Sequence, residues 1–247
     1  MLPVGALVWT SIEPYPTGFS RAIFGKPTFA NVAGLFGSAD FRDALLNTLI
    51  VGAAAAIAMM VLGLLVGWVI VRGRSRGWSR TVGILAFIPH AAPGLIVGLS
   101  VLLIYLLIPI PLYETVWIIV VAIMTQEISL SSRFMSGALA QIDGQLEEAA
   151  AASGARWRQV LTRIVLPLTS RPFINGLLLV FLLAIKNLTL PLILVGPNSN
   201  VLATAIWTSY EAGTLVQASA MGTCLVVSVL AVTALARRFG DLAGVQE

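Results

Sequence analysis

Residues 44–71 read ALLNTLIVGAAAAIAMMVLGLLVGWVIV and contain no Asp, Glu, Lys or Arg. At roughly 1.5 Å of rise per residue, about 20 apolar residues cross a hydrocarbon core of roughly 30 Å as a helix. Two more runs, residues 81–113 and 212–236, also lack these charged residues. Buried helices of soluble proteins rarely run this far without a charged face, so the three runs predict membrane spans.

Two further candidate spans contain a single charge within the membrane stretch. They are residues 115–135, which contain Glu127, and residues 172–195, which contain Lys186. Over the whole chain 58% of residues are hydrophobic and 11% are charged, against about 25% charged in an average soluble domain. The sequence therefore predicts an all-α membrane protein, a polytopic helical bundle of about five complete transmembrane helices.

The first apolar stretch, residues 1–12, is too short to span a bilayer. No basic residue precedes Glu13 and Pro3 follows the start at once, which is unlike a secretory signal peptide. We interpret residues 1–40 as a partial first membrane helix whose beginning is missing, followed by an external loop; a short re-entrant anchor is the alternative. Residues 41–240 then form one transmembrane domain.

Basic residues are unevenly divided between the loops. Ten Lys or Arg fall in residues 72–80, 136–171 and the tail from residue 237, whereas three fall in the alternate loops. Because short loops rich in Lys and Arg stay on the cytoplasmic side, the first set and the C-terminus are predicted to be cytoplasmic. A nucleic-acid or lipid patch at residues 72–76 is a weaker interpretation, since a basic hairpin between spans requires neither partner.

Polar residues interrupt two of the spans. His90 lies between Pro89 and Pro93, and prolines remove backbone hydrogen bonds and bend helices. We therefore expect a bend there, with His90 serving as a ligand, a proton carrier or a structural group. A charge such as Glu127 costs roughly 2.5–3.5 kcal/mol at a helix centre on insertion scales, so it should face the bundle interior, water or a partner.

The second interruption is the cluster of Lys186, Asn187 and Thr189. This cluster breaks an otherwise apolar helix. It fits equally a lining of a substrate path or a polar lock between helices. Together with His90, these three residues are the candidates for a translocation path.

The loop at residues 141–168 reads QIDGQLEEAAAASGARWRQVLTRIVLPL. Asp143 is a plausible N-cap for a helix rich in alanine, and Gly154 can end that helix in a left-handed conformation. A second amphipathic segment follows from Trp157 to Ile164. The pattern predicts a helix, a tight turn and another helix, whose smooth alanine face fits a groove on a partner.

This loop resembles the signature loop of ABC importer permeases, which has Glu-Ala-Ala, three residues, Gly, nine residues, and Ile-x-Leu-Pro. The matching residues are Glu148, Ala149, Ala150, Gly154, Ile164, Leu166 and Pro167. The resemblance implies a type I importer permease fold, in which residues 141–168 dock into a cleft on a separate ATPase subunit. A generic helix of Ala and Glu would not explain the Gly and the Ile-x-Leu-Pro at these distances.

Other stretches of residues 41–240, among them FIPHAAPGLIVGLS and TLPLILVGPNSNVLATAIW, resemble the iron(III)-type branch of these permeases. That branch often fuses two halves in one chain, whereas this chain is a single half. The resemblance implies ferric iron as the substrate, with thiamine, polyamines, sulfate and aminophosphonates as alternatives. It also implies a bacterial inner membrane, a lipid bilayer environment, two ABC ATPase copies, an extracytoplasmic solute-binding protein and a second permease half.

Enzymatic chemistry is not expected from this chain. The only lysines, Lys26 and Lys186, are followed by Pro27 and Asn187, so no Gly-Lys-Ser/Thr phosphate loop is present. One His and one Cys predict no His/Cys metal site and no cofactor. The alternative from another class is an ion-driven secondary transporter that uses His90, Glu127 and Lys186 as coupling groups. An intramembrane protease would need a paired catalytic set, which the spans lack.

Overall fold

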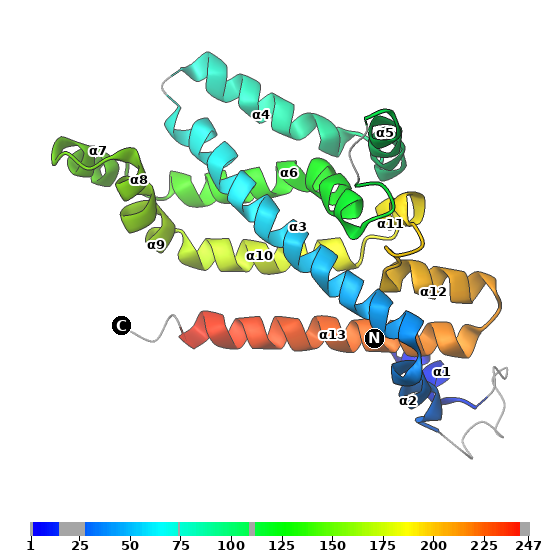
Figure 1. The fold of residues 1–247 in the computed structure, drawn as a ribbon. Helices are drawn as coiled ribbons and strands as arrows, with labels where there is room; N and C mark the ends of the chain where they lie inside the picture. The colour runs from blue at the N-terminus through cyan, green and yellow to red at the C-terminus, as the bar shows by residue number, and fades with distance from the viewer. Residues whose placement is uncertain (1, 15–27, 74, 109–111, 243–247) are drawn as a thin grey trace.

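The computed structural model describes residues 2–14, 28–73, 75–108 and 112–242, which form helices and turns and contain no β-strand (Figure 1). The main helices of the bundle include α3 (Ala39–Arg72), α6 (Val116–Ala140), α10 (Ser170–Ile185) and α13 (Leu215–Leu242). The remaining α-helices are α1 (Leu2–Ile12), α2 (Ala30–Gly37), α4 (Arg76–Ala91), α5 (Gly94–Leu107), α7 (Gln145–Ala152), α8 (Trp157–Val160), α9 (Leu166–Leu168), α11 (Thr189–Leu194) and α12 (Leu202–Glu211).

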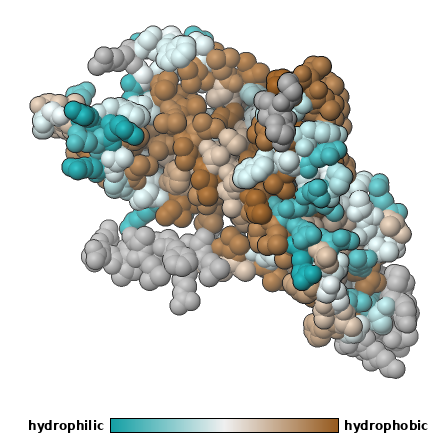
Figure 2. All heavy atoms as spheres, in the orientation of Figure 1, coloured by the Kyte–Doolittle hydropathy of each residue, from teal (hydrophilic) through white to brown (hydrophobic). Residues whose placement is uncertain are grey.

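Membrane spans account for most of these helices. α3, α6 and α13 up to Ala234 are long and apolar enough to cross a bilayer, and the described part of the chain holds up to five spans if each of two bent helix pairs counts as one. Figure 2 shows a hydrophobic band between two hydrophilic ends, one at α7 and α8 and the other around α12 and the start of α3. The prediction of an all-α, polytopic membrane protein is confirmed.

Two predicted spans are bent rather than straight. Residues 81–113 were expected to contain one span, but α4 ends at Ala91 and α5 leaves it at 103°. The predicted bend at Pro89 and Pro93 is therefore confirmed and is sharp enough to separate two helices. The span expected at residues 172–195 ends at Ile185, and α11 follows after a break.

Glycines bring α3 and α6 into backbone contact. Gly63 and Gly67 form a G-x-x-x-G pair, and a Cβ added to Gly63 would lie 2.7 Å from the carbonyl carbon of Ser131. A Cβ on Gly67 would lie 2.8 Å from the amide nitrogen of Ser136. Such small-residue pairs let helices approach closely in lipid. Because neither glycine has a side chain, α3 and α6 can pack this closely.

The N-terminal helices cover one end of α13. α1 packs along α13, where Leu7 lies against Gly222. Residues 15–27, which hold most of the predicted external loop, lie outside the described residues. The division of the chain at residue 40 therefore stays a prediction.

Candidate functional site

Residues 141–168 fold as a helical hairpin that projects from one end of the bundle (Figure 1). α7 forms its first arm. The second arm runs through α8, a π-helical turn η2 (Leu161–Val165) and α9. We call these residues the coupling hairpin. It lies between α6 and α10, so both of its ends continue into long helices.

The tip of the coupling hairpin is a Schellman turn. Gly154 has a φ of +83°. The amide of Ala155 donates to the carbonyl of Ala150 at 3.0 Å, and the amide of Gly154 donates to the carbonyl of Ala151 at 3.0 Å. These two bonds satisfy carbonyls that the end of α7 leaves free. The predicted left-handed end at Gly154 is confirmed, and it explains why the position requires glycine.

The start of α7 differs slightly from the prediction. Asp143 was expected to be the N-cap, but Gly144 occupies that position and gives no side-chain cap. Asp143 instead accepts a hydrogen bond from the amide of Gln145 at 3.0 Å. An Asp side chain can bond to the amide two residues further along the chain in a local turn. Asp143 therefore bonds to the first residue of α7 from the position before the N-cap. Glu147 and Glu148 lie in the first turn of α7.

The surface of the coupling hairpin is open to a partner. Glu148 and Ala149 are exposed and Ala150 is half-buried. Two large apolar side chains, Leu146 and Trp157, are exposed by 50% and 53%, although they belong to the hydrophilic end of the molecule. Exposed apolar side chains on a polar rim are typical of interaction sites.

A groove runs between the two arms of the coupling hairpin. It has a volume of about 430 Å³. Ala150 and Ser153 line it from the first arm, and Gln159, Arg163 and Ile164 line it from the second. The arms are therefore not packed tightly along their whole length.

The second arm is less regular than the predicted amphipathic helix. Across η2 the amide of Leu166 donates to the carbonyl of Leu161, five residues back. Pro167 has no amide hydrogen to donate to the preceding turn, which favours the wider π geometry. Ile164 is half-buried, whereas Leu166 and Pro167 are exposed. The chain then bends by 72° into α10.

Arg72 holds the first arm in place, and the sequence analysis missed this role. Its Nε lies 3.1 Å from Oε1 of Glu147, and its Nη2 donates to the carbonyls of Ile142 at 2.6 Å and Leu139 at 3.3 Å. Arg72 was assigned only to membrane topology. One feature of the sequence could have indicated this contact. Glu147 is acidic and lies next to Glu148, but the signature motif does not require an acidic residue at that position.

The path candidates fall into separate groups. His90 Nδ1 lies 3.9 Å from Oε2 of Glu127, too far for a hydrogen bond. Nearby, Arg133 lies over the ring of Phe87 at 4.5 Å. α4 and α6 therefore meet through polar and charged side chains within their apolar stretches.

The break after α10 holds the other path candidates. Lys186 caps α10 and is exposed, as is Thr189. The side chain of Asn187 accepts from the amide of Leu190 at 3.1 Å, in the first turn of α11, whose N-cap is Leu188. Among the described residues, no hydrogen bond or ion pair joins His90 to this cluster. Within the same residues, no group of three His, Cys, Asp or Glu side chains is placed to hold a metal ion.

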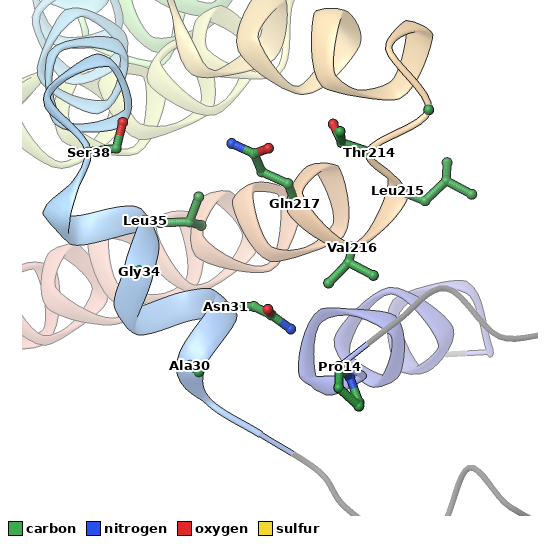
Figure 3. A pocket seen from close by; sticks show the side chains of 11 residues that line it. Pro14, Ala30, Asn31, Gly34, Leu35, Ser38, Thr214, Leu215, Val216 and Gln217 are labelled. Atoms are coloured by element: carbon green, nitrogen blue, oxygen red, sulfur yellow. The ribbon is translucent and has the colours of Figure 1, made fainter.

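A pocket of about 590 Å³ lies at the end of the molecule opposite the coupling hairpin. Figure 3 shows Asn31 and Leu35 of α2 and Gln217 of α13 around it, with Pro14 below and Thr214 above. The pocket has both polar and apolar walls.

Comparison with known proteins identifies a matching family. Residues 59–242 match the family described as "Binding-protein-dependent transport system inner membrane component". A ferric transport system permease protein, FbpB, of Actinobacillus pleuropneumoniae is 27% identical over 208 residues, which is 83% of this chain and 30% of that protein. The chain thus spans about a third of the length of this relative.

Two relatives have other names. The putrescine transport system permease protein PotI of Escherichia coli K12 is 29% identical over 74% of this chain and 66% of its own length. A putative 2-aminoethylphosphonate transport system permease protein, PhnV, of Salmonella paratyphi A is 25% identical over 93% of this chain and 84% of its own length.

Solved structures share the fold. A bacterial ABC transporter that imports the acidic polysaccharide alginate matches with a TM-score of 0.75, 20% identity and coverage of 97% of this chain and 88% of that chain. The alginate transporter in complex with an alginate pentasaccharide-bound periplasmic protein matches with a TM-score of 0.69 and 22% identity over 95% and 91% of the two chains. The chain therefore has the fold of ABC importer permeases.

Proposed function

We propose, from the premise that this chain belongs to the family of binding-protein-dependent transport system inner membrane components, that it is a permease subunit of an ATP-driven ABC importer. The observation that carries the proposal is the coupling hairpin. Its motif residues Glu148 and Ala149 are exposed on α7, which a Schellman turn at Gly154 closes, at the polar end of an apolar bundle. A surface of this shape suits docking into a cleft.

The proposed partner at the coupling hairpin is an ABC ATPase subunit in the cytoplasm. Glu148, Ala149, Ala150 and Gly154 form the part that enters its cleft, and Ile164, Leu166 and Pro167 connect that part to α10. The excess of basic residues in the loops at this end supports a cytoplasmic location for it and for the C-terminus. In this proposal ATP hydrolysis belongs to the partner subunit.

The opposite end is proposed to face an extracytoplasmic solute-binding protein. The pocket between α2 and α13 lies there, and the related alginate transporter has been solved with a periplasmic protein. A second permease half completes the path through the bilayer. His90, Lys186, Asn187 and Thr189 are the candidates to line it, because they interrupt apolar helices.

Ferric iron is the first substrate to test, because ferric permeases are among the relatives with the strongest similarity. Putrescine and 2-aminoethylphosphonate are the alternatives that the other relatives suggest, and thiamine and sulfate follow from the wider family. Uptake of each labelled solute by vesicles that contain the whole complex distinguishes them. Only the true substrate should be accumulated.

The decisive experiment tests ATPase docking. The Glu148→Arg variant should enter the membrane normally but should no longer retain the ABC ATPase during purification, because an exposed acidic contact becomes basic. An Arg76→Met variant, altered at an exposed residue outside the coupling hairpin, serves as the control. Normal ATPase capture and transport by Glu148→Arg would count against the proposal.

The ion-driven alternative rests on one observation, the closeness of His90 and Glu127. It is tested in the same vesicles. Uptake that requires ATP and stops without the ATPase supports the importer. Uptake driven by a proton gradient alone would replace the importer with a secondary transporter.

A further inference from the structure

Arg72 joins three helices through one guanidinium group. It is the last residue of α3, yet its bonds reach the carbonyl of Leu139 in the last turn of α6, the carbonyl of Ile142 just past that helix, and the carboxylate of Glu147 in α7. The planar guanidinium suits this task because its donors point in fixed, different directions. Loss of Arg72 would thus remove a contact between α3 and the end of α6 and a contact between α3 and α7 at once.

These contacts differ from an ordinary surface ion pair. The side chains of Arg72 and Glu147 expose only 21% and 12% of their surfaces. The carbonyl of Leu139 lies in the last turn of α6 and also accepts from the amide of Ile142 at 3.2 Å, whereas Ile142 lies just past the end of that helix. Carbonyls at a helix C-terminus carry partial negative charge. Arg72 therefore brings a positive charge and additional donors to this helix end, in addition to pairing with Glu147.

The helix behind Arg72 is well suited to transmit a displacement. α3 contacts the backbone of α6 at Gly63 and Gly67, and its Gly52 contacts the side chains of Phe181 and Ile185 of α10. Close-packed interfaces of this kind move as units rather than deforming continuously. A force applied to α7 through Arg72 would reach the centre of the bundle.

We propose that Arg72 is a positioning residue that transmits movement of α7, driven by the ATPase, directly to α3. This inference rests on the proposed function and adds a second route to the chain connection through α8, η2 and α10. That chain connection contains a π turn and a 72° bend. The route through Arg72 contains neither.

The test uses the whole complex in proteoliposomes, with substrate uptake and ATP hydrolysis measured together. Arg72→Met should retain the ATPase subunit and hydrolyse ATP, while solute transported per ATP falls about tenfold, a typical size for allosteric coupling. Glu147→Gln should lower the ratio by about threefold, since one partly exposed ion pair contributes little and the carbonyl contacts remain. Arg76→Met, which removes an exposed positive charge from the same region, should leave the ratio unchanged.

Three outcomes overturn the inference. The first is an unchanged transport-to-ATP ratio in Arg72→Met. The second is loss of the ATPase from that variant, which would make Arg72 part of the docking surface only. The third applies if Arg72→Met does not fold, in which case Arg72→Lys and Glu147→Gln are measured instead. An unchanged ratio of solute transported to ATP hydrolysed in both variants would then overturn the inference.

Failure of the proposed function has a different signature. In that case the wild-type complex itself would not capture an ATPase or would transport without ATP. A double variant, Arg72→Met with Glu147→Gln, should be no worse than Arg72→Met alone, because both remove the same connection.

Discussion

The two ends of the coupling hairpin are built differently. At the entry, between α6 and α7, the chain is tied to a third helix by Arg72 and starts α7 within a few residues. At the exit, between α8 and α10, the chain passes through a π turn and a 72° bend. Thr169 marks this bend, and both its amide and its hydroxyl donate to the carbonyl of Val165.

This difference suggests a division of labour. The contact of Arg72 at the entry keeps α7 in a fixed position relative to α3. At the exit, the angle between the second arm and α10 can change at a low cost in free energy. π turns and Thr side chains that bond four residues back are both associated with helix bends. The following substitutions test this difference between the entry and the exit, and they are given in order of decreasing expected effect.

The foundation of the entry is the contact between α3 and α6. In Gly63→Val, the new Cβ would lie 2.7 Å from the carbonyl carbon of Ser131, and backbone atoms cannot move aside as a flexible side chain can. We expect the free energy of unfolding to fall by about 3 kcal/mol, near the upper end for overpacked sites. Thermal unfolding in detergent measures it. Gly137→Val in α6, where nothing lies within 4 Å, is the control, and equal midpoints would contradict the prediction.

The tip connects the two ends and depends on Gly154. Gly154→Val places a β-branched residue at φ +83°, which costs about 1–2 kcal/mol. The arms should then separate, and ATPase capture should fall about tenfold for that energy. Gly154→Asn should recover part of the capture, because Asn tolerates the left-handed region. Equal capture by the Val and Asn variants would show that backbone conformation is not the cause.

The bend at the exit depends partly on Thr169. Thr169→Val removes the hydroxyl that donates to Val165 at 2.7 Å, while the amide bond to the same carbonyl remains. Stability should change by less than about 1 kcal/mol, but the bend should open. Spin labels at residues 158 and 179, in a variant without Cys224, should move apart. An unchanged label distance would assign the bend to η2 and Pro167 alone.

The smallest effect is expected at the start of α7. Asp143→Ala removes the exposed acceptor for the amide of Gln145 and should cost about 0.5–1 kcal/mol locally. Hydrogen exchange at Gln145 should accelerate, with transport nearly unchanged, because Arg72 still holds the entry. Asp143→Asn keeps an acceptor and should exchange more slowly than the Ala variant. A large loss of transport would mean that Asp143, like Arg72, is needed to hold the start of α7 in position.

Local signals in the sequence predicted the spans and the hairpin. A run such as residues 44–71 specifies a span by itself, because the bilayer requires apolar residues and internal backbone bonding. Gly154 likewise specified its turn, since few other residues adopt a positive φ. The bend near Pro89 and Pro93 was expected for the same local reason.

Features that depend on distant residues were not predicted. Arg72 and Glu147 are 75 residues apart, and nothing near either residue identifies the other. The size of the 103° bend between α4 and α5 also depends on packing against neighbouring helices. The pairing of His90 with Glu127 was missed because two lone polar residues on different helices have many possible partners.

The length of α3 makes bilayer thickness a physical variable for this protein. Its uncharged stretch, residues 44–71, is about 42 Å long as a helix, whereas the hydrocarbon core is about 30 Å thick. α3 runs obliquely across α6, α10 and α13 (Figure 1), and tilt is the usual response to such mismatch. Longer acyl chains would favour a more upright α3. Arg72 lies at the end of α3 and contacts α7. A change in the tilt of α3 with lipid composition is therefore expected to shift the resting position of α7.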